Sequence, residues 1–219
     1  SGDVTCTGDG DGRDNNPTDP GDWVDNTAIH AGCDTQASDS SWHGTFVSGI
    51  IAATANNGLG LTGVDWQAKI LPVRVLSKGG GYDSDIADGM LWAAGLPIAG
   101  IPNNPTPAKV LNLSLGGSSA SCPRTYQEAI DKITAAGSVL VVAAGNSGAS
   151  SLNQTPANCN GVIAVAASSR AGYKTDYTDS GSNVALSAAG GGTVYLTYST
   201  SNSGLTRADS AQNTYVNSR

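Results

Sequence analysis

The sequence predicts an α/β fold with three layers, in which helices cover a mostly parallel sheet. Three observations predict it. Short apolar segments alternate with helical segments between residues 40 and 180. Residues 138–144 and 162–167 are apolar at nearly every position, which is typical of strands buried on both faces of a parallel sheet. The regular succession of strand and helix is that of a doubly wound α/β domain.

The first predicted helix begins near His43, where Ser40 and Ser41 can cap it. Gly58 is expected to end it. Within it, apolar side chains recur at helical spacing: Phe46, Val47, Ile50 and Ile51.

The next elements are a strand and a second helix. Residues 68–76 predict the strand, and the glycines Gly79, Gly80 and Gly81 form the loop after it. The helix runs from about Asp83 to Leu96 and places Ile86, Met90, Ala93 and Ala94 on one face.

The remaining elements lie between residue 109 and the end of the chain. A short strand at 109–115 precedes a helix that Cys122-Pro123 opens and Gly137 ends. The strands 138–144 and 162–167 follow, and residues 193–199 read as one arm of a hairpin. With no repeat or linker, we expect one domain: an acidic region at 1–39, an α/β core at 40–180, and a hairpin with a tail at 181–219.

Acidic residues are concentrated at the start of the chain. Half of the 18 acidic residues lie within residues 1–39, beside a single arginine, while the formal net charge of the whole chain is −7. This balance argues against binding to nucleic acid, which needs a basic face, and against binding to an anionic membrane surface. No apolar run reaches the roughly 20 residues that a membrane helix needs.

The four cysteines show no Cys-x-x-Cys spacing, so a zinc cluster is disfavoured. Two disulfides explain the even number better than four free thiols. Three pairings are open, of which the simplest is local: Cys6 with Cys33, and Cys122 with Cys159. Disulfides predict an oxidising, extracellular or periplasmic setting. The chain shows no signal peptide, so we expect a mature or trimmed product.

Three short segments carry groups that can perform chemistry. His43 opens a helix and is followed by Gly44, which leaves room near the imidazole. Asn146 follows an apolar strand, at the end where parallel sheets bind ligands, and its amide can donate to an oxyanion. The strand that ends in residues 114–117 leaves backbone free to pair with an extended peptide. Taken alone, each also fits an ordinary structural role or turn.

These segments occur in a fixed order: Trp42 to Ala53 with His-Gly-Thr, Leu111 to Gly117 with Ser-Leu-Gly-Gly, and Val141 to Gly148 with Ala-Ala-Gly-Asn. Together they closely resemble three blocks of the subtilisin-like serine peptidases, over about residues 40–190. The resemblance implies a serine endopeptidase that hydrolyses peptide bonds in proteins. It makes His43 the general base of an Asp-His-Ser triad and Asn146 part of the oxyanion hole. It also implies positions that border the substrate: Gly79, Gly80, Gly81, Ser114, Leu115, Gly116, Ala143, Ala144 and Gly145.

The acidic segment at 8–22 resembles an insertion in a bacterial secreted branch of that family. Asp9, Asp11 and Asp14, with glycines between them, have the spacing that wraps oxygen ligands around Ca²⁺, and Asp22 is a further candidate. Asp19 and Asn15 are weaker candidates. No Glu completes an EF-hand loop, and the alternative is a solvated acidic loop. We expect a structural calcium ion here.

Two parts of the family pattern are not found. The catalytic Asp is expected in an Asp-Thr/Ser-Gly block near the start, and the catalytic Ser in a Gly-Thr-Ser-x-Ala block after the hairpin. Asp3, Asp34 and Ser218 lack these surroundings. We therefore expect a fragment of a peptidase, incomplete at both termini, with both blocks outside it.

Without those two groups, binding and the oxyanion hole alone give roughly 10³–10⁴-fold over water, so this fragment should be inactive by itself. The alternative is a non-catalytic, calcium-stabilised peptide-binding domain or a pseudoenzyme. In either case we expect a secreted monomer whose partners are peptides or proteins.

Overall fold

The computed structural model describes residues 4–10, 12–13, 16–192, 194–210 and 214–218. The chain divides into two compact units. The first contains Ser1–Ile86 and Tyr198–Asn217, and the second contains Ala87–Thr197 and Ser218–Arg219. Among the described residues, no helix has the length and apolar character needed to cross a membrane.

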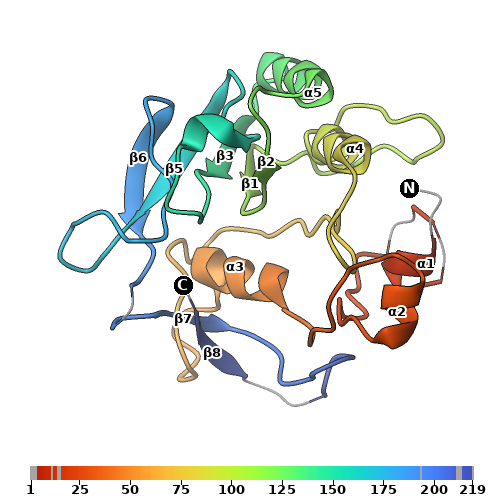
Figure 1. Cartoon of the computed structure of the whole chain (residues 1–219), viewed down its shortest axis with the longest axis horizontal. Helices are drawn as coiled ribbons and strands as arrows, with labels where there is room; N and C mark the ends of the chain where they lie inside the picture. Colours follow the sequence, from red (N-terminus) through yellow and green to blue (C-terminus); the bar gives the residue numbers. More distant parts are fainter. Residues whose placement is uncertain (1–3, 11, 14–15, 193, 211–213, 219) are drawn as a thin grey trace. The chain divides into compact units, whose positions relative to one another are not determined.

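The second unit is built on a four-stranded parallel sheet (Figure 1). Its strands, in spatial order, are β1 (Val110–Leu113), β3 (Val139–Ala143), β5 (Val162–Ser168) and β6 (Val184–Ala189). Strands β1, β3 and β5 pair without a register shift, with Leu113 opposite Val142 and Val142 opposite Ala164. The pairing of β5 with β6 shifts by one residue between Ala164 and Val165. The predicted α/β class with a mostly parallel sheet is confirmed.

Helix α5 (Arg124–Ala135) connects β1 to β3 and packs against β3. Its buried face consists of Tyr126, Ala129, Ile130 and Ile133. Gly137, with φ of +86°, follows the helix as predicted, since a left-handed residue ends a helix and glycine adopts that conformation without a steric penalty. The Cys122–Cys159 disulfide joins the segment before α5 to the segment before β5, in the predicted pairing.

Burial along β3 alternates, although nearly every residue is apolar. Leu140 and Val142 are fully buried, whereas Val139 is 42% exposed and Val141 is half-buried. The expectation of equal burial on both faces is therefore wrong for this strand. An apolar run in the sequence predicts a strand, but it does not determine how much of each face is buried. The burial of each face depends on which helices and loops pack against it.

Short elements complete the second unit. Strand β2 (Gly117–Ser118) pairs antiparallel with β4 (Gln154–Thr155), and a single 3₁₀ turn at Ser151–Asn153 precedes β4. Helix α4 (Asp83–Ala93), whose residues up to Ile86 belong to the first unit, buries Ile86, Met90 and Ala93 of the predicted face. It ends before Leu96, the predicted end, because Gly95 adopts a φ of +83°.

The first unit contains helices α1 (Val4–Thr7), α2 (Asn26–His30) and α3 (His43–Ala52). Strands β7 (Thr197–Thr200) and β8 (Tyr215–Ser218) form a two-stranded sheet. The Cys6–Cys33 disulfide joins α1 to the turn after α2, again in the predicted pairing. Residues 193–199 are predicted to form one arm of a hairpin; residue 193 lies outside the described residues, and among the others β7 begins only at Thr197 and pairs with β8.

Two further predictions for this unit are wrong. Residues 68–76 form no strand, because within the described ranges no neighbouring backbone pairs with them, and a strand exists only through such pairing. Helix α3 ends at Ala52, well before Gly58. The N–H groups of Val64 and Asp65 bind the carbonyls of Ile50 and Ile51, which a longer helix would use itself.

Candidate active site

His43 is the first residue of α3, as predicted, and its side chain is exposed. The residue that caps the helix is Trp42, in a left-handed conformation with φ of +48°. Of the two predicted caps, Ser41 accepts the His43 N–H on its hydroxyl oxygen at 3.4 Å, and it donates its own N–H and hydroxyl to Asp22, at 2.7 and 2.6 Å. The Ser40 hydroxyl instead donates to the Thr206 carbonyl.

Trp42 anchors the start of α3. Its indole is buried, and the indole N–H donates to the Gly204 carbonyl at 2.6 Å. Burial of the indole with its N–H satisfied stabilises the unusual backbone of this residue. The backbone immediately before His43 is therefore held in place by the buried Trp42 side chain.

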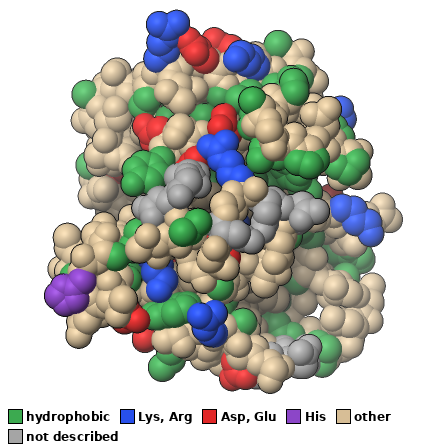
Figure 2. Space-filling view, turned by 90° about the vertical axis from the view of Figure 1, so that its right-hand side faces the viewer, with side chains coloured by type: hydrophobic (Ala, Val, Ile, Leu, Met, Phe, Trp, Pro, Cys, Tyr) green, Lys and Arg blue, Asp and Glu red, His purple; other side chains and the backbone are tan. Residues whose placement is uncertain are grey.

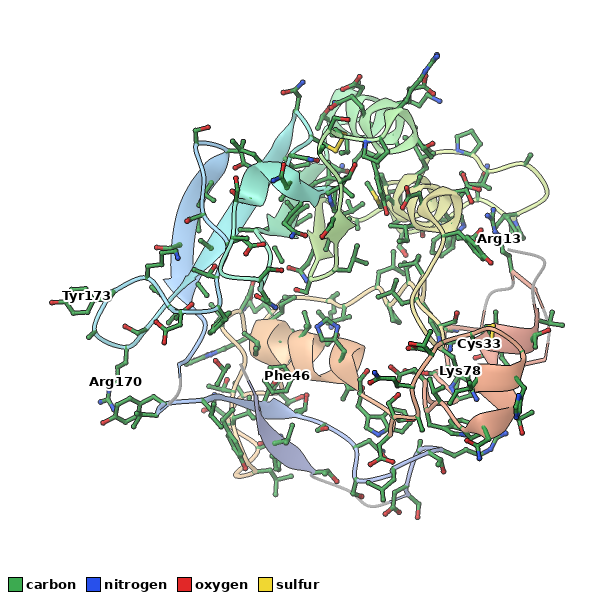
Figure 3. All side chains as sticks on the ribbon, in the orientation of Figure 1. Arg13, Cys33, Phe46, Lys78, Arg170 and Tyr173 are labelled. Carbon is green, nitrogen blue, oxygen red and sulfur yellow. A yellow bond between two sulfur atoms is a disulfide. The ribbon has the colours of Figure 1, made fainter. Side chains whose placement is uncertain are left out.

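The body of α3 is bound to β7. Ser199 donates its hydroxyl to the Phe46 carbonyl at 2.6 Å, and Thr200 donates to the Thr45 carbonyl at 2.8 Å. Phe46 is labelled on α3 in Figure 3. A Cβ at Gly49 would lie 2.1 Å from the Thr200 hydroxyl, so a glycine is required for this approach. The helix that carries His43 is thus fixed at its start and along one face.

The glycines 79–81 form a tight turn in the first unit. Ser77 and Gly80 exchange two backbone hydrogen bonds, and a Cβ at Gly79 would lie 1.6 Å from the Cys33 carbonyl oxygen. Cys33 and Lys78 lie side by side in Figure 3. Gly79 is therefore required by packing on the disulfide segment, while Gly80 faces open space among the described residues.

The acidic segment is only partly described, since Asp11, Asp14 and Asn15 lie outside the described residues. The Arg74 guanidinium binds Asp9 Oδ2 at 3.1 Å and lies 3.4 Å from Asp19 Oδ1. Acidic and basic side chains also stand next to one another on the face shown in Figure 2. The described residues contain no cluster of three His, Cys, Asp or Glu side chains suited to a metal ion.

In the second unit, two predicted segments meet at one edge of the sheet. Ser114–Gly116 follow β1, and Ala144–Asn146 follow β3. Because β1 and β3 are parallel neighbours, their carboxyl ends lie together. Ser114 Oγ accepts a hydrogen bond from Asn112 Nδ2 at 3.0 Å. The structure thus brings together the candidates of the second and third blocks, including Ala143 at the end of β3.

The side chain of Asn146 is exposed and makes no hydrogen bond within the described part of the chain. The backbone on both sides of it is nevertheless bonded: the Ala144 N–H donates to the Val165 carbonyl, and the Gly145 carbonyl accepts from the Asp179 N–H, both at 2.9 Å. A free amide on a fixed backbone is the arrangement that an oxyanion donor needs, because it requires no reorganisation when charge develops.

Asp179 is a residue that the sequence analysis missed. It is completely buried, and its Oδ1 accepts hydrogen bonds from the Ser147 N–H at 2.9 Å and the Ala149 N–H at 2.7 Å. Its sequence context, Asp-Ser-Gly, is that of an ordinary turn, so nothing in the sequence indicated burial.

The chain is similar in sequence to a known protein family and to two extracellular proteases. A family model described as "Subtilase family" matches residues 10–218. An extracellular protease of Xanthomonas campestris pv. campestris is 47% identical over 209 residues, which cover 95% of this chain and 35% of that protein. An extracellular basic protease of Dichelobacter nodosus is 47% identical over 184 residues, covering 83% of this chain and 30% of that protein.

The same similarity is found among solved structures. A protease from Pseudoalteromonas arctica superposes with a TM-score of 0.90 and 44% identity, covering 99% of this chain and 63% of that one. The chain therefore spans about a third of the length of the two curated relatives named above.

Proposed function

The chain belongs to the subtilase family, and from this premise we propose that it supplies the general base and an oxyanion donor of a secreted serine endopeptidase. The observation that carries the proposal is Asn146: an exposed amide without a partner among the described residues, on a bonded backbone at the carboxyl edge of a parallel sheet. The family relationship and the His-Gly-Thr block at the start of α3 support it.

The proposed reaction divides the work between the two residues. The His43 imidazole takes the proton of a serine hydroxyl as that oxygen attacks the peptide carbonyl, and it then returns the proton to the leaving amine. The Asn146 amide donates to the oxygen that becomes negative in the tetrahedral intermediate. The 219 residues contain no Gly-Thr-Ser-x-Ala block, and no Asp-Thr/Ser-Gly block stands near their start. Neither the serine nor the partner aspartate is therefore assigned to a residue of this chain.

We propose proteins and peptides as substrates, bound in extended form. The segments 114–116 and 143–145 end two adjacent parallel strands, and β2 leads away from the first of them. Backbone groups at such a position pair with an extended chain, while the small side chains leave space for a substrate residue.

The test uses the protein expressed from its complete coding sequence. We expect a fluorophosphonate to label it, His43→Ala to lower peptide turnover by about 10⁴-fold or more, and Asn146→Ala by roughly 10²–10³-fold. His30→Ala is the control, because His30 is the exposed last residue of α2. Absence of labelling together with unchanged turnover would support a peptide-binding pseudoenzyme instead.

Secretion and calcium are further proposals. The named relatives are extracellular proteases, and the two disulfides suit an oxidising compartment.

The support for calcium is the spacing of Asp9, Asp11 and Asp14. Asp9 binds Arg74 and Asp22 binds Ser41. These partners within the protein favour the alternative, a solvated loop without a metal ion. A thermal midpoint that falls in EDTA and recovers with Ca²⁺ would support the ion, and an unchanged midpoint would support the solvated loop.

A further inference from the structure

We propose that Asp179 is a positioning residue that fixes the Asn146 loop, residues 144–149, for stabilisation of the oxyanion. The inference rests on the proposed function, because it assigns a role to Asp179 through Asn146.

Asp179 is bonded to the loop on both sides of Asn146. Before Asn146, the Asp179 N–H donates to the Gly145 carbonyl at 2.9 Å. After it, Asp179 Oδ1 accepts from the N–H groups of Ser147 and Ala149, at 2.9 and 2.7 Å. One buried residue therefore determines the backbone position of both neighbours of the catalytic amide. Hydrogen bonds to a carboxylate are about twice as strong as neutral ones, so this is an effective restraint.

The contact with Gly145 is also close. Gly145 has a φ of +114°, and a Cβ at this position would lie 2.1 Å from Asp179 Oδ2. The carboxyl group thus packs directly against the backbone that precedes Asn146. A glycine is required there by its conformation and by this approach.

The second oxygen of this carboxyl group is exceptional. Asp179 Oδ2 is buried and has no hydrogen-bond partner within the described residues. A buried oxygen without a partner is unfavourable, and native structures contain few such atoms. The other oxygen of the same carboxyl group accepts from two N–H groups of the Asn146 loop, and these two bonds are the contribution of Asp179 to the position of the loop.

The test measures kcat and KM on the protein expressed from its complete coding sequence. We expect Asp179→Ala to lower kcat by roughly 10- to 100-fold, part of the 10²–10³-fold that loss of a whole oxyanion donor costs, with KM within about twofold. Asp179→Asn keeps the Oδ1 acceptor and should restore kcat to within about threefold. If Asp179→Ala does not fold, Asp179→Ser, whose short hydroxyl cannot serve both N–H groups, should show the same loss in kcat.

A double-mutant cycle shows whether the effect acts through Asn146. In an Asn146→Ala background, Asp179→Ala should cause no further loss, since the amide it positions is gone. An equal loss in both backgrounds, or an unchanged kcat in the single variant, would overturn the inference. If Asn146→Ala itself leaves turnover unchanged, the proposed function fails instead, so the two failures are distinguishable.

Asn183→Ala is a matched control for destabilisation. The Asn183 amide donates to the carbonyls of Ser151 at 3.2 Å and Ala157 at 2.8 Å, just beyond the loop. We expect it to lower the thermal midpoint without lowering kcat. Amide exchange at Ser147 and Ala149 should accelerate in Asp179→Ala and stay slow in Asn183→Ala; faster exchange in both variants would indicate a general structural role and contradict the proposal.

Discussion

The two units fix their candidate catalytic residues by different physical means. In the second, Asn146 follows β3, which has hydrogen-bonded neighbours on both sides and the buried side chains Leu140 and Val142. In the first, His43 begins a helix whose only buried residue is Gly49. The position of Asn146 therefore derives from the sheet together with the hydrogen bonds of Asp179 to the loop that follows β3. The position of His43 derives from individual contacts alone.

In the first unit, each segment of the chain is held by a small number of individual side-chain contacts. The Lys78 ammonium lies 3.8 Å from the centroid of the Trp23 ring, and the Arg207 guanidinium lies 5.1 Å from it. Asp22 binds Ser41, and the Cys6–Cys33 bond joins two short helical segments. Loss of one such contact is expected to loosen its segment. In a sheet, the many remaining backbone hydrogen bonds still hold a strand when one contact is lost.

Removal of each disulfide tests this difference between the units, and it is expected to have the largest effect on stability. The bonds span 27 and 37 residues, so chain entropy predicts similar losses of about 3.5 and 4 kcal/mol when each is removed. We expect different local consequences. Replacing Cys6 and Cys33 by alanine should accelerate amide exchange throughout residues 4–34, while replacing Cys122 and Cys159 should leave β3 and β5 protected. Equal loss of protection in both units would remove the distinction.

A smaller effect is expected from the core of the sheet. Leu140 is completely buried, and Leu140→Ala should lower the free energy of unfolding by about 3 kcal/mol, measured by urea denaturation. Its neighbour Val139, which is 42% exposed on the same strand, is the matched control, and Val139→Ala should cost less than about 1 kcal/mol. Similar losses would mean that burial does not explain the stability of β3.

The smallest effect concerns the cap of α2 in the first unit. Asp25 accepts a hydrogen bond from the Ala28 N–H at 2.9 Å, and this bond lowers the pKa of the Asp25 carboxyl. A lowered folded pKa stabilises the helix above the unfolded pKa of about 3.9, and the contribution is lost as the pH falls through the folded value. The protection of the Ala28 amide, measured as its exchange rate relative to that of an unfolded reference at the same pH, should therefore fall below about pH 4. In Asp25→Asn this dependence should disappear; its persistence would assign it to another group.

Some features of the fold follow from the sequence because their causes are local. Pro123 at the start and Gly137 after the end predict the bounds of α5 closely. Apolar runs locate β3 and β5, and the local disulfide pairing needs only the positions of the cysteines. The order of the three blocks, with His43 and Asn146 in them, is likewise a property of the sequence alone.

The features that the sequence could not reveal depend on partners far along the chain. Residues 68–76 have the composition of a strand but lack a pairing neighbour among the described residues, and α3 stops where residues 63–65 take its carbonyls. Asp179 becomes important only because the tertiary structure brings it, buried, against the Asn146 loop some thirty residues earlier. The sequence by itself thus determined the fold class, the family and the chemical groups available. Only the tertiary structure decided which backbone segments restrain them, because hydrogen bonding and burial are properties of residues that meet in space.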